Sequence, residues 1–260
     1  MYKLSVGAVF KNEEHSIKEW IEHYLNHGVE HFYLINDNSN DNYLEKIQYY
    51  LDTNVVTLYD AGVEFNSYTG RQKDMYNKYI LPHIKESKWL LIVDLDEYMW
   101  SPVHKDLNVM LDQCTHFGQV QINHTLFGSN GRIMQPDSIV NSFTKRSHCL
   151  DTHIPNGNFK YFVNSNFVFT SLNVHHATFA NDSYHNDINV FIKLGPEYFR
   201  LNHYCCQSFN FWKDIKCTRG DSDNYKVRNI EEFYTYDLNE VEDYDLINQN
   251  FENPERKSGF

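Results

Sequence analysis

The stretch Lys88-Trp89-Leu90-Leu91-Ile92-Val93-Asp94-Leu95-Asp96 decides the fold prediction. The run that ends at Val93 is apolar, contains β-branched residues and is short, which favours a buried strand over a helix. Side chains at i and i+2 of a strand point the same way, so Asp94 and Asp96 leave the carboxyl edge of a sheet together. Open α/β sheets bind ligands at that edge.

Two carboxylates this close repel each other unless a cation, a proton or a basic side chain lies between them. Hard oxygen ligands favour Mg²⁺ or Mn²⁺, which commonly hold substrate phosphates. The pair Asp94 and Asp96 is therefore a candidate metal site. Taken alone, an Asp-x-Asp pair is more often the solvated acidic turn that follows a strand, and the neighbouring sequence shifts the interpretation towards a site.

Residues on the amino-terminal side of this stretch alternate between strand and helix patterns. Strands are predicted at 4–10, 31–35 and 54–59, and helices at 13–27, 43–51 and 69–86. Four such alternations indicate a mostly parallel sheet with helices on its faces. The glycine fingerprint GxGxxG does not follow the first strand, which disfavours the usual dinucleotide-binding fold.

The pattern changes after Pro102. A short helix near 107–111 precedes strand-like runs at 119–126, 139–143, 160–163, 167–172, 188–193 and 199–204. Turn-rich pieces between them predict a mixed, partly antiparallel extension of the sheet. We expect one α/β domain over 1–240, with a nucleotide-binding half at 1–100, an acceptor-binding half at 101–240 and a loosely packed tail at 241–260.

Composition restricts the class of function. The 260 residues carry a net charge of −12 and no run of basic residues, which argues against nucleic acid as a partner. The longest apolar runs fall short of the roughly 18 residues of a membrane span, and the amino terminus lacks a secretory pattern. We therefore predict a cytoplasmic protein. Five cysteines without a CxxC pair predict reduced thiols.

Other polar residues stand where a nucleotide site needs them. His203 ends a predicted strand and would complete a cation site begun by Asp96, with His175 and His176 as lower-ranked alternatives. Arg71 and Gln72 begin a helix, where anions bind, although a solvated first turn explains them equally well. The polar loop 36–42 would suit a ribose or a base edge.

Taken in order, these pieces resemble glycosyltransferases of the GT-A fold, and within them family 92 and related bacterial and viral family 2-like enzymes. The matching stretches are Phe10-Lys11-Asn12-Glu13, Trp20-Ile21-Glu22-His23-Tyr24, 28–39, Arg71-Gln72-Lys73, Val93-Asp94-Leu95-Asp96-Glu97-Tyr98, Phe127-Gly128-Ser129, Asn202-His203-Tyr204 and Arg219-Gly220. Each stretch is weak alone, and their order over residues 3–220 is fairly specific. The resemblance implies a mixed sheet with helices on both faces, a parallel first half and a partly antiparallel second half.

The resemblance also implies a role for particular residues. The nucleotide pocket would be lined by Ala8, Phe10, Asn12 and Glu13, with Asp37 near the base or ribose and with Arg71 and Gln72 near the nucleotide or its diphosphate. Asp94 would contact the ribose or a metal-bound water, and Asp96 and His203 would bind Mn²⁺ (or Mg²⁺). Relatives typically carry Lys-Ser after the His-Tyr pair. Gln207 stands in place of that lysine here, and Lys213 or Arg219 would substitute for it.

The reaction implied is transfer of a sugar from a nucleotide-sugar, a UDP-sugar by resemblance, to a glycan or other hydroxyl acceptor with inversion. Such a reaction needs a base to deprotonate the acceptor. Asp182 is the first candidate for it, and Asp187 and Asp151 are its rivals. The alternatives are an inactive nucleotide- or carbohydrate-binding module and a metal-dependent nucleotidyltransferase, the latter disfavoured because no phosphate-binding glycine loop appears. The sequence does not indicate an oligomeric state.

Overall fold

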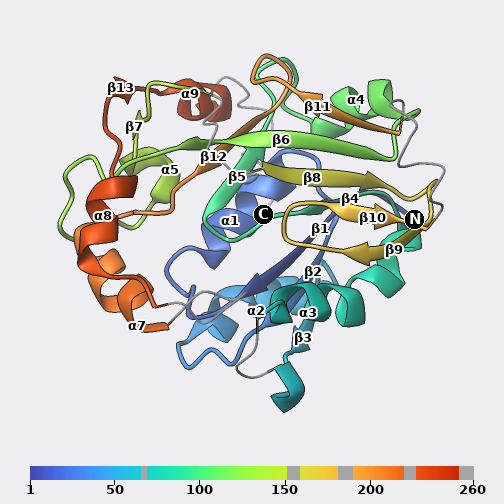
Figure 1. Cartoon of the computed structure of the whole chain (residues 1–260), viewed down its shortest axis with the longest axis horizontal. Coiled ribbons are helices and arrows are strands. Elements are labelled where there is room, and N and C mark those ends of the chain that lie inside the picture. Colours follow the sequence, from blue (N-terminus) through green and yellow to red (C-terminus); the bar gives the residue numbers. More distant parts are fainter. Residues whose placement is uncertain (66–68, 151–158, 181–189, 220–226, 252–260) are drawn as a thin grey trace.

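The computed structural model describes residues 1–65, 69–150, 159–180, 190–219 and 227–251. Its centre is a nine-stranded sheet in the order β3-β2-β1-β4-β8-β6-β12-β5, with β11 paired to β6. Helices cover both faces of this sheet (Figure 1). The mixed α/β class predicted from the sequence is confirmed.

The first half of the sheet is parallel. Strands β1 (Tyr2–Phe10), β2 (His31–Asn36), β3 (Val56–Asp60) and β4 (Ser87–Ile92) alternate with helices α1 (Ile17–Asn26), α2 (Tyr43–Asp52) and α3 (Arg71–Tyr79). Strand β1 pairs in parallel with β2 and with β4, and β2 pairs in parallel with β3. The polar residues that follow these strands therefore gather at one edge of the sheet, as predicted.

The second half of the sheet is mixed. Strands β5 (Glu97–Trp100), β6 (Gln119–Leu126), β8 (Phe159–Asn164), β11 (Phe191–Leu194) and β12 (Arg200–His203) belong to the main sheet, whereas β9 (Phe169–Leu172) and β10 (Ala177–Phe179) form a hairpin. Strand β8 runs antiparallel to both β4 and β6, and β12 runs parallel to β6 but antiparallel to β5. The partly antiparallel character predicted for this half is confirmed.

Shorter elements complete the described chain. They are η1 (Val63–Phe65), η2 (Leu81–Glu86), α4 (Leu107–Leu111), η3 (Asp112–Cys114), α5 (Ile139–Ser142), β7 (Lys145–Arg146), α6 (Phe209–Phe211), the π-helix η5 (Trp212–Lys216), α7 (Cys217–Arg219), α8 (Ile230–Tyr236), β13 (Val241–Glu242) and α9 (Asp245–Phe251). Within the described residues, every helix is too short or too polar to cross a membrane.

Alternating side chains of the strands bury two separate apolar layers. One face of β1 packs Leu4, Val6 and Ala8 beneath α1 and α2, and the opposite face contributes Val9 to the layer under α3. Gly7 lies on that second face, where an added Cβ would come within 2.8 Å of Ile80 Cδ1, so a side chain there would push α3 away from the sheet.

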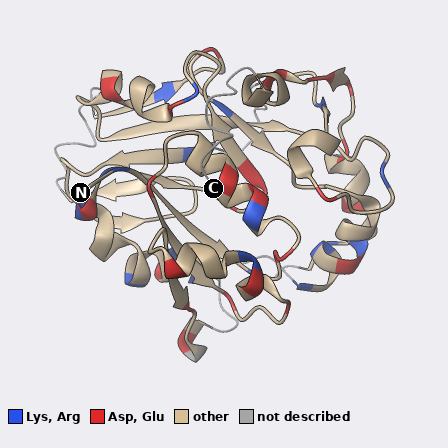
Figure 2. Cartoon of the chain, turned by 180° about the vertical axis from the view of Figure 1, so that it is seen from behind, with Lys and Arg blue, Asp and Glu red and all other residues tan. Residues whose placement is uncertain are grey.

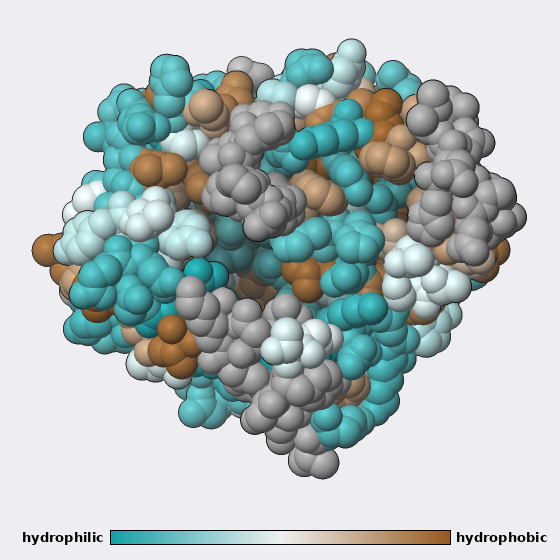
Figure 3. Space-filling model, in the orientation of Figure 1, coloured by the Kyte–Doolittle hydropathy of each residue, from teal (hydrophilic) through white to brown (hydrophobic). Residues whose placement is uncertain are grey.

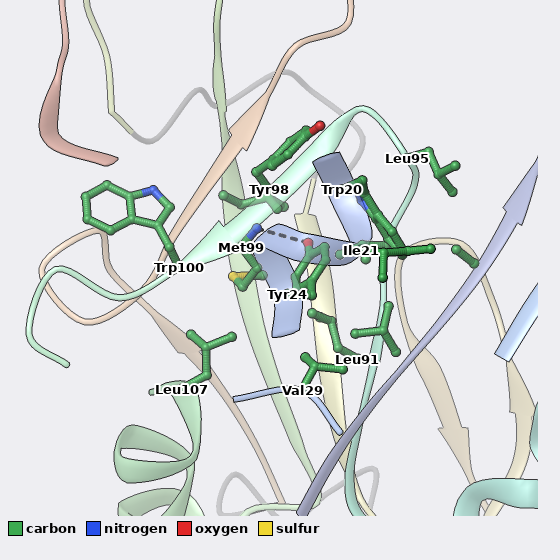
Figure 4. Close-up of a cluster of buried hydrophobic side chains, with 14 of the residues drawn as sticks. Trp20, Ile21, Tyr24, Val29, Leu91, Leu95, Tyr98, Met99, Trp100 and Leu107 are labelled. Atoms are coloured by element: carbon green, nitrogen blue, oxygen red, sulfur yellow. Dashed lines mark hydrogen bonds between the residues drawn. The ribbon is translucent and has the colours of Figure 1, made fainter. Parts of the chain in front are cut away.

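Helix α1 is held to the sheet by large aromatic residues. The rings of Trp20 and Tyr24 pack edge to face with centroids 4.8 Å apart, and the Tyr24 hydroxyl accepts a hydrogen bond from Met99 N of β5 at 3.0 Å (Figure 4). Aromatic side chains of this size bury about 150–250 Å² each, at about 25 cal/mol per Å² of apolar surface. Trp20 Nε1 and the Tyr24 hydroxyl also donate to Glu97 O at 3.0 Å each, so burial and hydrogen bonds together fix α1.

Three predictions about the elements were wrong. Residues 139–143 form helix α5 instead of a strand, because the Glu19 carboxylate accepts hydrogen bonds from Ile139 N at 2.6 Å and Val140 N at 3.1 Å and so caps a helix. The predicted helix at 69–86 ends at Tyr79, and Pro82 lies in the first turn of the separate 3₁₀ helix η2.

The third concerns the expected tail, whose beginning packs against the domain and whose residues 245–251 form helix α9. The Asp243 carboxylate accepts a hydrogen bond from Arg146 Nε at 2.6 Å and pairs with Arg200, and Leu246 is buried. These contacts reach back across 43 and 97 positions, so the local sequence pattern does not contain them.

Candidate functional site

A cavity of about 290 Å³ lies at the carboxyl edge of the parallel strands. Its wall includes Lys11 and Glu13 after β1, Asp94 and Asp96 after β4, and His203 at the end of β12. The space-filling view shows a hollow with hydrophilic surroundings near the centre of this face (Figure 3). The order of the strands therefore brings residues from distant parts of the chain to one site.

The floor of the cavity, which we define as Asp94, Glu97, His124 and Lys160, is a buried network of charges. Lys160 is fully buried, and its Nζ donates to Asp94 Oδ2 at 2.7 Å and lies 3.5 Å from Glu97 Oε2. His124 Nε2 lies 2.8 Å from Glu97 Oε1. Gln72 Nε2 donates to Asp94 Oδ1 at 3.0 Å, so both oxygens of Asp94 are engaged.

Burial and neighbouring charges shift the pKa values of the floor residues in opposite directions. Burial disfavours a charge on Glu97, but Lys160 and His124 beside it hold its pKa below the usual value. Burial lowers the pKa of His124 to about 4 against the opposing effect of Glu97, so the imidazole is neutral at physiological pH. The pKa of Lys160 is raised despite burial because Asp94 and Glu97 stabilise its charge.

Asp96 lies between two basic side chains. Lys216 Nζ donates to its Oδ2 at 2.8 Å, and His203 Nε2 lies 3.6 Å from its Oδ1. Burial works against a charge on Asp96, but Lys216 and His203 hold its pKa well below the ordinary value. Burial also disfavours a charge on His203, while Cys205 and Asp96 raise its pKa to about 9.

The rim of the cavity, which we define as Trp212, Lys216, Arg219 and Arg228, supplies three cationic side chains. Arg219 Nη1 lies 2.6 Å from Glu13 Oε1, and Arg228 Nη1 donates to the Tyr236 hydroxyl at 3.3 Å. Lys216 is the last residue of the π-helix η5, and such irregular turns are frequent at functional sites. The rim therefore concentrates positive charge opposite the carboxylates.

Over the rest of the ribbon, Lys and Arg alternate with Asp and Glu (Figure 2). The whole chain is acidic, with a net charge of −12, so its overall field repels an anion. Attraction of an anionic ligand has to come from local cations such as those of the rim.

The donor set beside the cavity fits a divalent cation. Ligand atoms of Asp94, Asp96 and Glu97 lie within 4.8 Å of one another, as do those of Glu97, His124 and His203. His203 Nδ1 is buried without a hydrogen-bond partner among the described residues. Carboxylate oxygens and imidazole nitrogens are ligands that Mn²⁺ accepts. Lys216 donates to Asp96 Oδ2, whereas Oδ1 lies toward His203, so the Lys216 ammonium and a metal ion would share one carboxylate.

Eight residues named from the sequence line this cavity: Phe10, Glu13, Gln72, Asp94, Asp96, His175, His203 and Arg219. Four others lie outside its wall. Ala8 is buried in the core, and the Asn12 side chain accepts a hydrogen bond from Asn40 N at 2.9 Å. Arg71 and Asp37 are buried and paired with each other, so the pair joins α3 to the end of β2. The ligand contacts implied for these four residues stay predictions.

Lys213 and Arg219 were expected to substitute for the lysine that relatives carry where this chain has Gln207. Only one of the two is at the cavity. Arg219 is on its wall, whereas the Lys213 side chain is half exposed beside Asp214. Gln207 itself has a positive φ of 47° and accepts hydrogen bonds from Gln135 and His15, which hold it in the loop. Asp182, with its rivals Asp187 and Asp151, lies outside the described residues.

Six residues of the floor and rim were not predicted: Glu97, His124, Lys160, Trp212, Lys216 and Arg228. Glu97 directly follows the Asp-x-Asp pair, and that proximity was a usable signal. His124 and Lys160 lie within strands whose apolar pattern does not distinguish them, and Lys160 lies 66 positions from Asp94. The pairing of β8 with β4 brings Lys160 beside Asp94, and the pairing of β8 with β6 brings in the strand that carries His124.

Comparison with known proteins identifies related sequences and folds. The profile of glycosyltransferase family 92 matches residues 3–243. The structure of S. aureus TarS 1-349 is similar with a TM-score of 0.44 and 17% identity, over 82% of this chain and 63% of that one. A second TarS 1-349 structure, in complex with UDP-GlcNAc, has a TM-score of 0.39 and 18% identity, over 65% of this chain and 49% of that one. HddC from Yersinia pseudotuberculosis follows with a TM-score of 0.40 and 12% identity, over 76% of this chain and 92% of that one. No curated protein sequence matches the chain.

Proposed function

Since the chain belongs to glycosyltransferase family 92, we propose that it transfers a sugar from a nucleotide-sugar, with UDP as the nucleotide, to a hydroxyl of a glycan or another acceptor. The proposal includes a divalent cation, Mn²⁺ or Mg²⁺, and inversion at the sugar carbon. One observation carries it. A single cavity places the carboxylates Asp94 and Asp96 opposite Lys216, Arg219 and Arg228.

This charge arrangement suits a nucleoside diphosphate better than a neutral sugar. A diphosphate needs cationic donors around its oxygens, and Lys216, Arg219 and Arg228 supply them from one side of the cavity. The carboxylates on the other side would repel the same anion unless a cation stood between them. The acidic floor and the basic rim together therefore favour a diphosphate that binds with a metal ion.

Asp96 and His203 would hold that cation, with Asp94 beside them, and the cation would neutralise charge on the departing diphosphate. A cation held there would require the neutral form of His203. The ammonium of Lys216 and the guanidinium of Arg219 lie at the cavity wall, where they would donate to phosphate oxygens. Gln72 and Lys160 keep the Asp94 carboxylate oriented.

The test is the identity of the product nucleotide. Purified protein is incubated with UDP-hexoses, Mn²⁺ and a panel of mono- and disaccharides, and the released nucleotide is separated by ion-exchange chromatography. We expect UDP, and we expect Asp94→Asn to slow its release at least tenfold. Release of hexose 1-phosphate, with UMP when water is the acceptor, would support a nucleotidyl transfer instead. Binding of UDP without any turnover would leave a binding module and contradict the proposal.

A further inference from the structure

His175 lies at the cavity with a fixed tautomer. The residue follows β9, its ring is half-buried, and it belongs to the cavity wall. Its Nδ1 lies 3.0 Å from the carbonyl oxygen of Phe159. A carbonyl oxygen only accepts hydrogen bonds, so Nδ1 must carry the proton. In the neutral ring, Nε2 is then the unprotonated nitrogen and can accept a proton.

Nε2 of His175 has no partner among the residues that the structure describes. The other described carboxylates and imidazoles of the cavity wall are each engaged with a charged or ionisable group. Glu13 pairs with Arg219, Asp94 with Lys160, Asp96 with Lys216 and His203, and Glu97 with His124. Nδ1 of His124 and Nδ1 of His203 also lack a partner in the described part of the wall, but both atoms are buried, whereas the ring of His175 is only half-buried.

The surroundings of His175 keep its ring neutral. Burial and the positive charge of Lys160 lower the pKa of His175, and the negative charges of Asp94 and Glu97 oppose this effect without cancelling it. Among the described residues, His175 hydrogen-bonds to the carbonyl of Phe159, which lies on the same strand as Lys160. A neutral imidazole at physiological pH is the form that a general base requires.

We propose that His175 is the general base of the transfer reaction, an inference that rests on the proposed function. Nε2 takes the proton of the acceptor hydroxyl as the acceptor oxygen bonds to C1 of the donor sugar. The bond from C1 to the phosphate oxygen breaks, and its electron pair leaves with the nucleoside diphosphate. The imidazolium then returns its proton to solvent. The Phe159 carbonyl orients the ring throughout and stabilises the positive charge that forms on it.

The experiment compares loss of the basic atom Nε2 alone with loss of both ring nitrogens of His175. His175→Asn keeps a donor near the place of Nδ1 but lacks Nε2, and His175→Ala lacks both. His176→Asn, at the exposed neighbouring residue, is the matched control. The readout is UDP released from UDP-hexoses with the saccharide panel and with water alone. We expect both His175 variants to lose about 10²–10⁴-fold in kcat with unchanged affinity for UDP, and the control to keep the wild-type rate.

Added imidazole tests whether the missing ring itself accounts for the loss of activity. It should restore part of the rate of His175→Ala, in which the ring has left a space, and should leave the wild type unchanged. Asp182→Asn tests the rival base suggested by the sequence. The inference is overturned if His175→Asn keeps the wild-type kcat, or if imidazole fails to accelerate His175→Ala.

Failure of the inference and failure of the proposed function give different results. An active wild type with an active His175→Asn removes His175 from catalysis and leaves the transferase proposal standing, all the more if Asp182→Asn is inactive. A wild type that releases no UDP from any donor, with saccharides or with water, overturns both.

Discussion

The floor and the rim of the cavity both pair a lysine with an aspartate, but they hold the lysine in different ways. Lys160 is fully buried near the start of strand β8, and its Nζ lies near two carboxylates. Lys216 ends a single π-helical turn, and its side chain is 16% exposed beside Asp96. A buried charge cannot be left without a partner, whereas a lysine at the surface can exchange one partner for another. The floor is therefore part of the fold, and the rim is the part that can respond to a ligand.

The largest change in stability is expected from Lys160→Met. This change leaves the buried Glu97 and the partly exposed Asp94 without their shared cation, so we expect a loss of about 3–5 kcal/mol in the free energy of unfolding. Urea unfolding followed by fluorescence measures it. Lys88→Met, which breaks the exposed pair with Asp112, is the control and should cost less than about 1 kcal/mol. A stability of Lys160→Met within 1 kcal/mol of the wild type would show that the floor is not a structural unit.

Acid should lower the free energy of unfolding through the buried histidines at α1. Helix α1 packs His23 and His27 behind β5, and burial lowers the pKa of His27 to about 4. This folded pKa lies below the unfolded value of about 6.5, so the contribution is complete above pH 6.5 and is lost as the pH falls toward 4.

We expect the His27 contribution to fall by about 2 kcal/mol between pH 7 and pH 5. Unfolding free energies of the wild type and of His27→Asn, measured across this range, check the prediction. The variant should show a shallower pH dependence. Equal slopes for the two proteins would mean that His27 is not held neutral in the folded state.

Local sequence signals were sufficient for the parallel half of the sheet and for three residues of the site. The apolar run before Asp94 identifies a buried strand, and two-residue spacing places Asp94 and Asp96 on one side. His203 was predicted from its place at the end of a strand. Asp37 and Arg71 were assigned to the nucleotide by resemblance, whereas the structure pairs them with each other.

What the sequence did not predict depends on contacts between distant residues. Nothing near Lys160 reveals that β8 lies beside β4 and places its side chain under Asp94. Helix α5 is capped by Glu19, 120 residues earlier in the chain. Lys216 was missed because its position follows from the π-helical turn, for which the sequence has no recognised pattern.

A smaller effect, on ligand affinity instead of stability, is expected at the rim. Lys216→Met should weaken UDP binding about tenfold, since a hydrogen bond to a charged group contributes about 1.5–3 kcal/mol, and should change the unfolding free energy by less than 1 kcal/mol. Lys213→Met, on the same π-helical turn but away from the cavity, is the control. Isothermal titration calorimetry measures the affinities. If both variants bind UDP like the wild type, the rim is not the site of the diphosphate.

The central claim is that one cavity binds a nucleoside diphosphate together with a divalent cation at Asp96. Thermal unfolding of the wild type, Asp96→Asn and the control Asp112→Asn, each with UDP, with Mn²⁺ and with both, tests it most directly. A ligand present at 100 times its dissociation constant stabilises the folded state by about 2.7 kcal/mol. The account predicts that UDP raises the melting temperature of the wild type and of Asp112→Asn only when Mn²⁺ is present, and that Asp96→Asn loses this increase. An equal increase in Asp96→Asn, or no increase in the wild type with GDP and CDP tried as well, would contradict it.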